Sequence, residues 1–258
     1  MSAVAVLSDI RAERIKLSTT RSVLWMAAAA AVLSIGLAAV QGSTAYGAAP
    51  LPPEKAAMGA AVFGVPVLMI LAAMTVTGEY RSGMIRTTFM ATPNRSVVLV
   101  AKAIVAAVFS GVYAAVMTIA AVVVGRLMAP PLAGSRLSFA DPDTWRLVGA
   151  IAMFAVLAAV LGVGAAALLR HSAGAVALLL LWPLLVEPVL GNLPSIGSEV
   201  GPYLPFANAF RFIDVQWLYP AYAMPWDVVG SLLYFTTVVA VVYAAAIVVV
   251  NRRDARGG

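Results

Sequence analysis

The stretch VLVAKAIVAAVFSGVYAAVMTIAAVVV, residues 98–124, decides the fold class. It is almost wholly apolar and exceeds the ~20 residues that a helix needs to cross the hydrocarbon core of a bilayer. The whole chain shares this character, because 62% of its 258 residues are apolar and 11% are charged. Soluble domains average about 45–50% apolar and roughly 25% charged residues. Such a chain cannot bury its apolar surface in one water-soluble core, so we expect a membrane protein.

Hydropathy predicts six spanning segments along the chain, of which this stretch is one. They are residues 23–40, 58–77, 98–124, 147–169, 174–190 and 228–250. The fifth is the least regular, because Pro183 interrupts it and Glu187-Pro188 lies near its end. We therefore expect an all-α membrane protein with six transmembrane helices, in which residues 1–258 form a single transmembrane domain.

Positive charge is unevenly divided between the predicted loops. If the N-terminus is cytoplasmic, 12 of the 17 Lys and Arg residues lie on that side and five on the other. The positive-inside rule then predicts that both termini are cytoplasmic. The net charge of +6 is explained by topology, and the chain lacks the basic face with aromatic platforms expected for nucleic-acid binding.

Small residues recur every four positions in two of the predicted spans. Ala103, Ala107, Gly111 and Ala115 do so in the third, and Ala158, Gly162 and Ala166 in the fourth. This spacing allows close helix packing. Alanine is so common in the chain that the pattern could also arise without a packing role.

The charged segment before the first span, residues 3–18, has an amphipathic pattern. At ~100° per residue, Leu7, Ile10 and Leu17 share one arc, and Arg14 falls inside it, so that its side chain would have to snorkel. The segment could be a helix lying along the inner membrane surface or an ordinary positive flank. No short apolar core with a small-residue cleavage site follows, so we expect residues 23–40 to remain as a span.

The longest predicted cytoplasmic loop is GEYRSGMIRTTFMATPNRS, residues 78–96. Gly78 can end the preceding span and Pro93-Asn94 favours a turn, which leaves residues 79–91 to form a short helix. A loop that only needed to be solvated would not expose Tyr80, Met84, Ile85 and Phe89. We expect another protein or the membrane surface to cover these side chains.

On the opposite side, residues 191–227 are too polar to span and too apolar to be simply solvated. Their aromatic residues are Tyr203, Phe206, Phe210, Phe212, Trp217, Tyr219, Tyr222 and Trp226. This density suits the headgroup level or a re-entrant hairpin packed on protein. Arg211 and Asp214 are three residues apart and could pair if that piece is helical.

The chain lacks the common sequence motifs of metal-binding and catalytic sites. The chain has no cysteine and one histidine, which excludes thiolate and multi-histidine metal sites, and it has no GxxxxGK[ST], HExxH or GxSxG motif. Glu187 is the one acidic residue in a predicted span. It could be a water-exposed carboxylate at the helix exit, a polar contact in a translocation pathway, or a proton-coupling group.

The segment GEYRSGMIRTTFMATPNRS followed by Lys102, residues 78–102, resembles the region between spans two and three of ABC-2 type transporter permeases. The segment ERIKLSTTR, residues 13–21, is similar to the entry that these permeases use before their first span. The six-span layout, with a long outer stretch before the last span, also agrees. The small form without an ATPase domain resembles bacterial drug, peptide and lipid exporters of the cell membrane.

The resemblance implies a function and partners. Residues 79–91 would be a coupling helix that docks on a separate ABC ATPase, residues 3–18 an interfacial helix, and residues 191–225 outer re-entrant helices. The ATPase-coupling residues would be Glu79, Tyr80, Arg81, Met84, Ile85, Arg86 and Phe89. Two permease subunits, identical or homologous, would work with two ATPases in the bacterial plasma membrane. ATP and Mg would bind only the ATPase, so the chain itself would have no cofactor, metal or catalytic residue.

Three other functions stay open at this point. A non-transporting anchor or sensor subunit could use the same loop. An ion-coupled secondary transporter would need an inverted repeat and ionisable residues at mid-membrane, neither of which is evident. An intramembrane enzyme would need polar catalytic residues at membrane depth.

Overall fold

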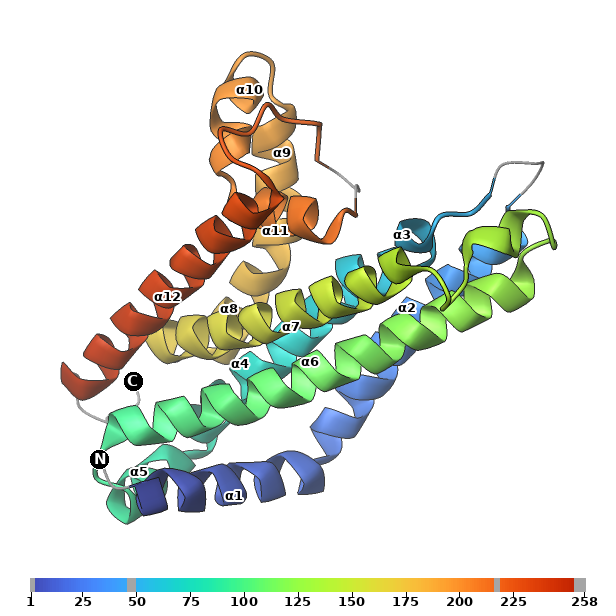
Figure 1. Ribbon diagram of the computed structural model, residues 1–258. Coiled ribbons are helices and arrows are strands. Elements are labelled where there is room, and N and C mark those ends of the chain that lie inside the picture. Colours follow the sequence, from blue (N-terminus) through green and yellow to red (C-terminus); the bar gives the residue numbers. More distant parts are fainter. Residues whose placement is uncertain (1–2, 46–49, 216–218, 253–258) are drawn as a thin grey trace.

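The computed structural model describes residues 3–45, 50–215 and 219–252, so Trp217 lies outside the described residues. Every regular element among them is a helix (Figure 1). The long helices and their connections are α1 (Ala3–Thr19), α2 (Arg21–Ser43), α3 (Pro53–Ala56), η1 (Ala60–Gly64), α4 (Val65–Ser82), α5 (Met84–Ala91), α6 (Arg95–Met128), η2 (Ala133–Arg136) and α7 (Pro142–Leu169). The remainder are α8 (Ser172–Leu181), η3 (Trp182–Val186), α9 (Glu187–Asn192), α10 (Ile196–Val200), η4 (Gly201–Tyr203), α11 (Pro205–Ile213) and α12 (Val228–Arg252).

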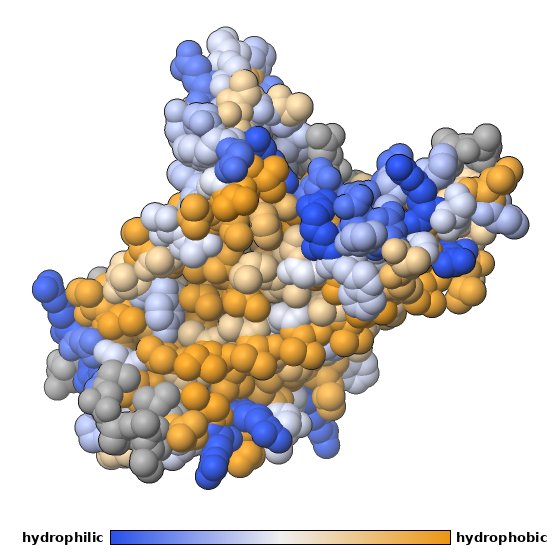
Figure 2. Space-filling view, in the orientation of Figure 1, coloured by the Kyte–Doolittle hydropathy of each residue, from blue (hydrophilic) through white to orange (hydrophobic). Residues whose placement is uncertain are grey.

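Within the described residues, six helices are long and apolar enough to cross a membrane. They are Arg21–Ser43, Ala60–Ser82, Arg95–Met128, Pro142–Leu169, Ser172–Asn192 and Val228–Arg252. Each overlaps one predicted span, so the predicted all-α fold with six membrane helices is confirmed. On the face shown in Figure 2, apolar residues cover the middle and hydrophilic ones gather toward the ends, as a bilayer requires.

The bundle has two distinct ends. At one end lie α1, α5 and the last turn of α12, and we call this the α5 end (Figure 1). At the other, the α11 end, lie α3, α10 and α11. The first described helix, α1, and the end of the last, α12, are therefore at the same end of the bundle, as an even number of spans requires.

Helices α4 and α7 form the centre of the bundle. In the most apolar windows of the span Ala60–Ser82, which is η1 with α4, and of α7, 78% and 67% of residues are buried, against 17% in α2 and 22% in α12. Their close packing depends on Gly162 in α7, where a Cβ would overlap the carbonyl oxygen of Met69 in α4. The spaced residues Ala158, Gly162 and Ala166 are all buried, which is the arrangement expected of a close helix contact.

The fifth span stays helical through its prolines. A π-helical turn, η3, contains Pro183, and α9 follows directly from Glu187. Proline lacks the N–H that an α-helical bond needs, and a π turn accommodates such a local change of hydrogen bonding. The interruption foreseen at Pro183 is therefore a local widening of the helix.

The predicted pairing of Arg211 with Asp214 is wrong. Asp214 ends α11 in a left-handed conformation, with φ 60°, so its side chain leaves the helix face that Arg211 occupies. Asp214 pairs with Arg146 at 3.3 Å. The Arg211 guanidinium donates instead to the carbonyl oxygen of Trp226 at 2.6 Å, which joins α11 to the start of α12.

We expect Gly162→Leu to destabilise the bundle by about 3 kcal/mol, since overpacking against backbone cannot be relieved by a rotamer change. Thermal unfolding of the detergent-purified chain measures this. Gly149→Leu is the matched control, because a Cβ at Gly149 meets no atom within 4 Å. Equal unfolding temperatures for the two variants would contradict the packing account.

Candidate functional site

The loop predicted to interact with a partner begins with a sharp break. Gly83 adopts φ +71°, which ends α4 and starts α5. This left-handed conformation strains residues that carry a Cβ. The predicted continuous helix over 79–91 is therefore divided, and Glu79, Tyr80 and Arg81 belong to the last turns of α4. The side chain of Asn94 then accepts a hydrogen bond from the N–H of Val97 and caps α6.

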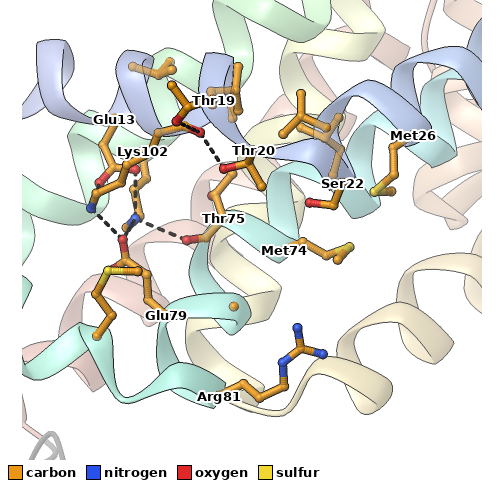
Figure 3. Close-up of a pocket in the computed structure, with 18 residues that line it drawn as sticks. Glu13, Thr19, Thr20, Ser22, Met26, Met74, Thr75, Glu79, Arg81 and Lys102 are labelled. Atoms are coloured by element: carbon orange, nitrogen blue, oxygen red, sulfur yellow. Dashed lines mark hydrogen bonds and ion pairs between the residues drawn. The ribbon is translucent and has the colours of Figure 1, made fainter.

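Four charged side chains from three helices form a cluster, and three of them, Glu13, Glu79 and Lys102, are labelled in Figure 3. They are Glu13 and Lys16 on α1, Glu79 on α4 and Lys102 on α6, and we call them the charge cluster. Lys102 Nζ lies 2.8 Å from both Glu13 Oε2 and Glu79 Oε1. Lys16 Nζ lies 2.8 Å from Glu13 Oε1 and 2.7 Å from Glu79 Oε1. Two ammonium groups and two carboxylates thus balance each other.

Lys102 is the most buried member, with 2% of its surface exposed, and all three of its N–H donors are used. The third donates to the carbonyl oxygen of Thr75 at 3.1 Å. A buried charge is tolerated only when it is paired and hydrogen-bonded. At Lys16, burial alone would lower the pKa, but hydrogen bonds to Glu13 and Glu79, together with their charges, outweigh this and raise the pKa of Lys16.

Helix α5 is fastened to the bundle at several points. Thr88 Oγ1 donates to Glu79 Oε2 at 3.3 Å, and Thr92 Oγ1 donates to Asp9 Oδ1 of α1 at 2.9 Å. The Arg95 guanidinium lies 5.1 Å from the centre of the Phe89 ring and donates to the carbonyl oxygen of Val250 in α12. A displacement of α5 would therefore pull on α1, α4, α6 and α12 together.

The seven predicted coupling residues differ in how far they are exposed to solvent. Arg81, Met84 and Arg86 are exposed, Tyr80 and Phe89 are half-buried, and Glu79 and Ile85 are buried. Tyr80 lies under the Arg170 guanidinium, 5.2 Å from ring centre to Cζ. Met90, which was not among the predicted residues, is 74% exposed, and Met84 is 49% exposed.

The partners of Glu79 in the charge cluster were missed from the sequence, although signals for them exist. Lys102 falls within the predicted span 98–124, and an ionisable residue there calls for a partner. Glu13 and Lys16 have the i, i+3 spacing that allows pairing on a helix. Because α4 continues to Ser82, Glu79 also lies in a spanning helix, so Glu187 is not the one acidic residue in a span.

Glu187 is fully buried, which contradicts its interpretation as a water-exposed carboxylate at a helix exit. Its Oε2 accepts the backbone N–H groups of Phe206 at 2.9 Å and Ala207 at 3.1 Å. Its Oε1 accepts the indole N–H of Trp182 at 2.9 Å. The carboxylate thus caps the first turn of α11 from inside the fifth span, where it meets the positive end of the helix dipole. Its role in a translocation pathway stays a prediction.

Lys102→Met should destabilise the protein by about 3–5 kcal/mol, because it leaves two buried carboxylates short of a counter-charge. Thermal unfolding in detergent measures the loss. Lys55→Met serves as the control, since Lys55 is exposed at the α11 end. Adding Glu79→Gln to Lys102→Met should restore part of the stability, and a double variant no more stable than the single one would contradict the pairing.

Glu187→Ala should loosen α11 by about 1–2 kcal/mol, the cost of losing a helix cap. Hydrogen–deuterium exchange should then accelerate at the amides of Phe206 and Ala207. Glu199→Ala, an exposed carboxylate at the same end, should leave that exchange unchanged. Unaltered exchange in Glu187→Ala would show that the carboxylate does not hold α11.

Comparison with known families tests the resemblance noted from the loop motif. Residues 10–184 match the family model described as ABC-2 family transporter protein, and this match includes the charge cluster, α5, four of the six spans and the first part of the fifth. A comparison with curated proteins finds none that matches the chain. Members of this family are membrane subunits that work with an ABC ATPase and are not themselves catalytic enzymes. The chain therefore belongs to the ABC-2 family of transporter proteins and is a membrane permease of an ABC-type transporter.

Proposed function

We propose that this permease is half of an ATP-driven exporter of an amphipathic substrate, a drug, peptide or lipid-like compound, in a bacterial plasma membrane. Its termini and α5 face the cytoplasm, in keeping with 12 of the 17 Lys and Arg residues on that side. ATP and Mg bind a separate ATPase subunit. This chain forms part of the transport pathway and itself catalyses no reaction.

The proposal rests on α5, which has exposed side chains on its outer side and is bonded to the bundle on its inner side. Met84, Arg86 and Met90 are all exposed on α5. Methionine and arginine are enriched in protein interfaces. On the inner side, Ile85 is buried and Thr88 bonds to Glu79. A short helix of this kind can receive a push from a docked partner and pass it to the bundle.

In this proposal the predicted coupling residues have two roles. Met84 and Arg86, joined by Met90, contact the ATPase directly, whereas Arg81 belongs to α4, before the break at Gly83. Glu79 acts as a positioning residue, because its carboxylate holds Lys102 of α6 and Lys16 of α1 against α4. Ile85, Tyr80 and Phe89 seat α5 on the bundle.

Two permease subunits, identical or homologous, would complete the transporter with two ATPases. Four of the spans are less than half buried within one chain, namely α2, α12, Ser172–Asn192 and α6 at 17%, 22%, 28% and 39%. Lipid and a second subunit can both be accommodated on these faces. A pathway between two such apolar surfaces suits an amphipathic substrate.

The test combines affinity purification of the chain with coexpressed candidate ABC ATPases and a vesicle ATPase assay. Arg86→Glu with Met90→Asp should reduce copurification at least tenfold, while Arg136→Glu at the α11 end should not. Glu79→Gln should copurify normally but lose the coupling between transport and ATP hydrolysis. If no ATPase copurifies, or if the α5 variant still binds one, the docking proposal fails. Copurification without transport of any amphipathic test compound would favour an anchor or sensor subunit.

A further inference from the structure

A cavity of about 410 Å³ opens beside the charge cluster, between α1, the first turns of α2, α4 and α6 (Figure 3). Its volume lies in the range of small-molecule sites, about 300–1,000 Å³. One part of its wall is charged and the other is apolar, with Leu17, Val23, Met26, Leu71 and Met74 contributing the apolar side. A ligand that fills it must have a polar head and an apolar tail.

The charges of the wall select the sign of that head. Three cations, Lys16, Arg81 and Lys102, line the cavity against two anions, Glu13 and Glu79. Both carboxylates are already engaged with ammonium groups, Glu13 through both of its oxygens. No anionic group is therefore left to receive a cationic ligand.

Hydrogen-bond donors, in contrast, are left over. Lys16 uses two of its three N–H groups, and 37% of its side chain is exposed. Among the described residues, the Arg81 guanidinium has no ion-pair or hydrogen-bond partner, and it points toward the open space below Met74 and Ser22 (Figure 3). The planar guanidinium matches the oxygens of phosphate or carboxylate.

The start of α2 adds a further attraction for an anion. Its first turn lines the cavity at Ser22 and Val23, it has no acidic residue, and the Thr20 side chain makes no capping bond there. The Val23 N–H already donates to the carbonyl oxygen of Thr20 at 3.1 Å, but the N-terminus of a long helix still carries partial positive charge.

From the cavity, its unpaired donors and its apolar wall, we propose that this is a binding site for an anionic amphiphile with a phosphate-like head group. The head group lies between Arg81, Lys16 and the start of α2, and the chain lies along Met26, Leu71 and Met74. This site does not depend on the docking of an ATPase, so it can be tested on the permease alone.

The test uses the purified chain in phosphatidylcholine nanodiscs and measures saturable binding of dodecyl phosphate. Dodecylphosphocholine, which has the same tail with a zwitterionic head, and inorganic phosphate, which has no tail, should each bind at least tenfold more weakly. If either probe bound as tightly as dodecyl phosphate, the proposal would be overturned. Binding would then not need the charged part of the wall, or would not need the apolar part.

Two variants locate the site. Arg81→Gln should weaken dodecyl phosphate about tenfold, the usual effect of losing a hydrogen bond to a charged group, while Arg86→Gln, which removes a charge at the same end but does not line the cavity, should have no effect. Gly78→Leu should abolish binding, because Gly78 lines the cavity and a Cβ there meets no atom within 4 Å. Gly149→Leu is its control. Binding that survives Arg81→Gln and Gly78→Leu, or falls equally in the controls, would refute the assignment.

Mass spectrometry of the purified protein then separates the two sources of such a ligand. An anionic lipid that copurifies with the unaltered chain but not with Gly78→Leu would identify a resident lipid. Absence of a copurifying lipid, together with saturable dodecyl phosphate binding, would identify a ligand that exchanges, as a transported compound must.

Discussion

The Lys102 ammonium is the charge that the rest of the α5 end depends on. It lies within a spanning helix with 2% of its surface exposed, where an unpaired charge costs several kcal/mol. Its counter-charges come from α1 and α4, so these two helices must meet α6 at this point. The position of α1, the end of α4 and the start of α5 all follow from this meeting.

At the α11 end a buried charged group also joins separate elements, but its partners are N–H groups and not charged side chains. In the part of the chain that the structure describes, Glu187 forms no ion pair and is instead satisfied by two backbone N–H groups at the start of α11 and the indole of Trp182. In both places a scarce polar group within apolar helices joins elements far apart in the sequence. With only 11% charged residues, the chain has few such groups, and these two organise opposite ends of the bundle.

How far the sequence could predict this protein differs between the fold and the site. Hydropathy alone identified all six membrane helices, because the requirement for an apolar run of ~20 residues is local. The motif in residues 78–102 also indicated the family. The division of residues 79–91 into outward Met84 and inward Ile85 was not predictable, since it follows from the break at Gly83 and from the neighbours that cover one side. The pairing of Asp214 with Arg146, 68 residues away, was missed for the same reason.

The composition and order of residues thus determined that the chain lies in lipid, how often it crosses, and which loop carries exposed methionine and arginine. These properties depend on transfer from water to hydrocarbon, a sum over neighbouring residues. The tertiary structure alone decided which charges face one another, that Glu79 turns inward while Arg81 turns toward a cavity, and that Glu187 caps a distant helix. Electrostatic pairing acts over a few ångströms in space, and only the packed bundle brings α1, α4 and α6 that close.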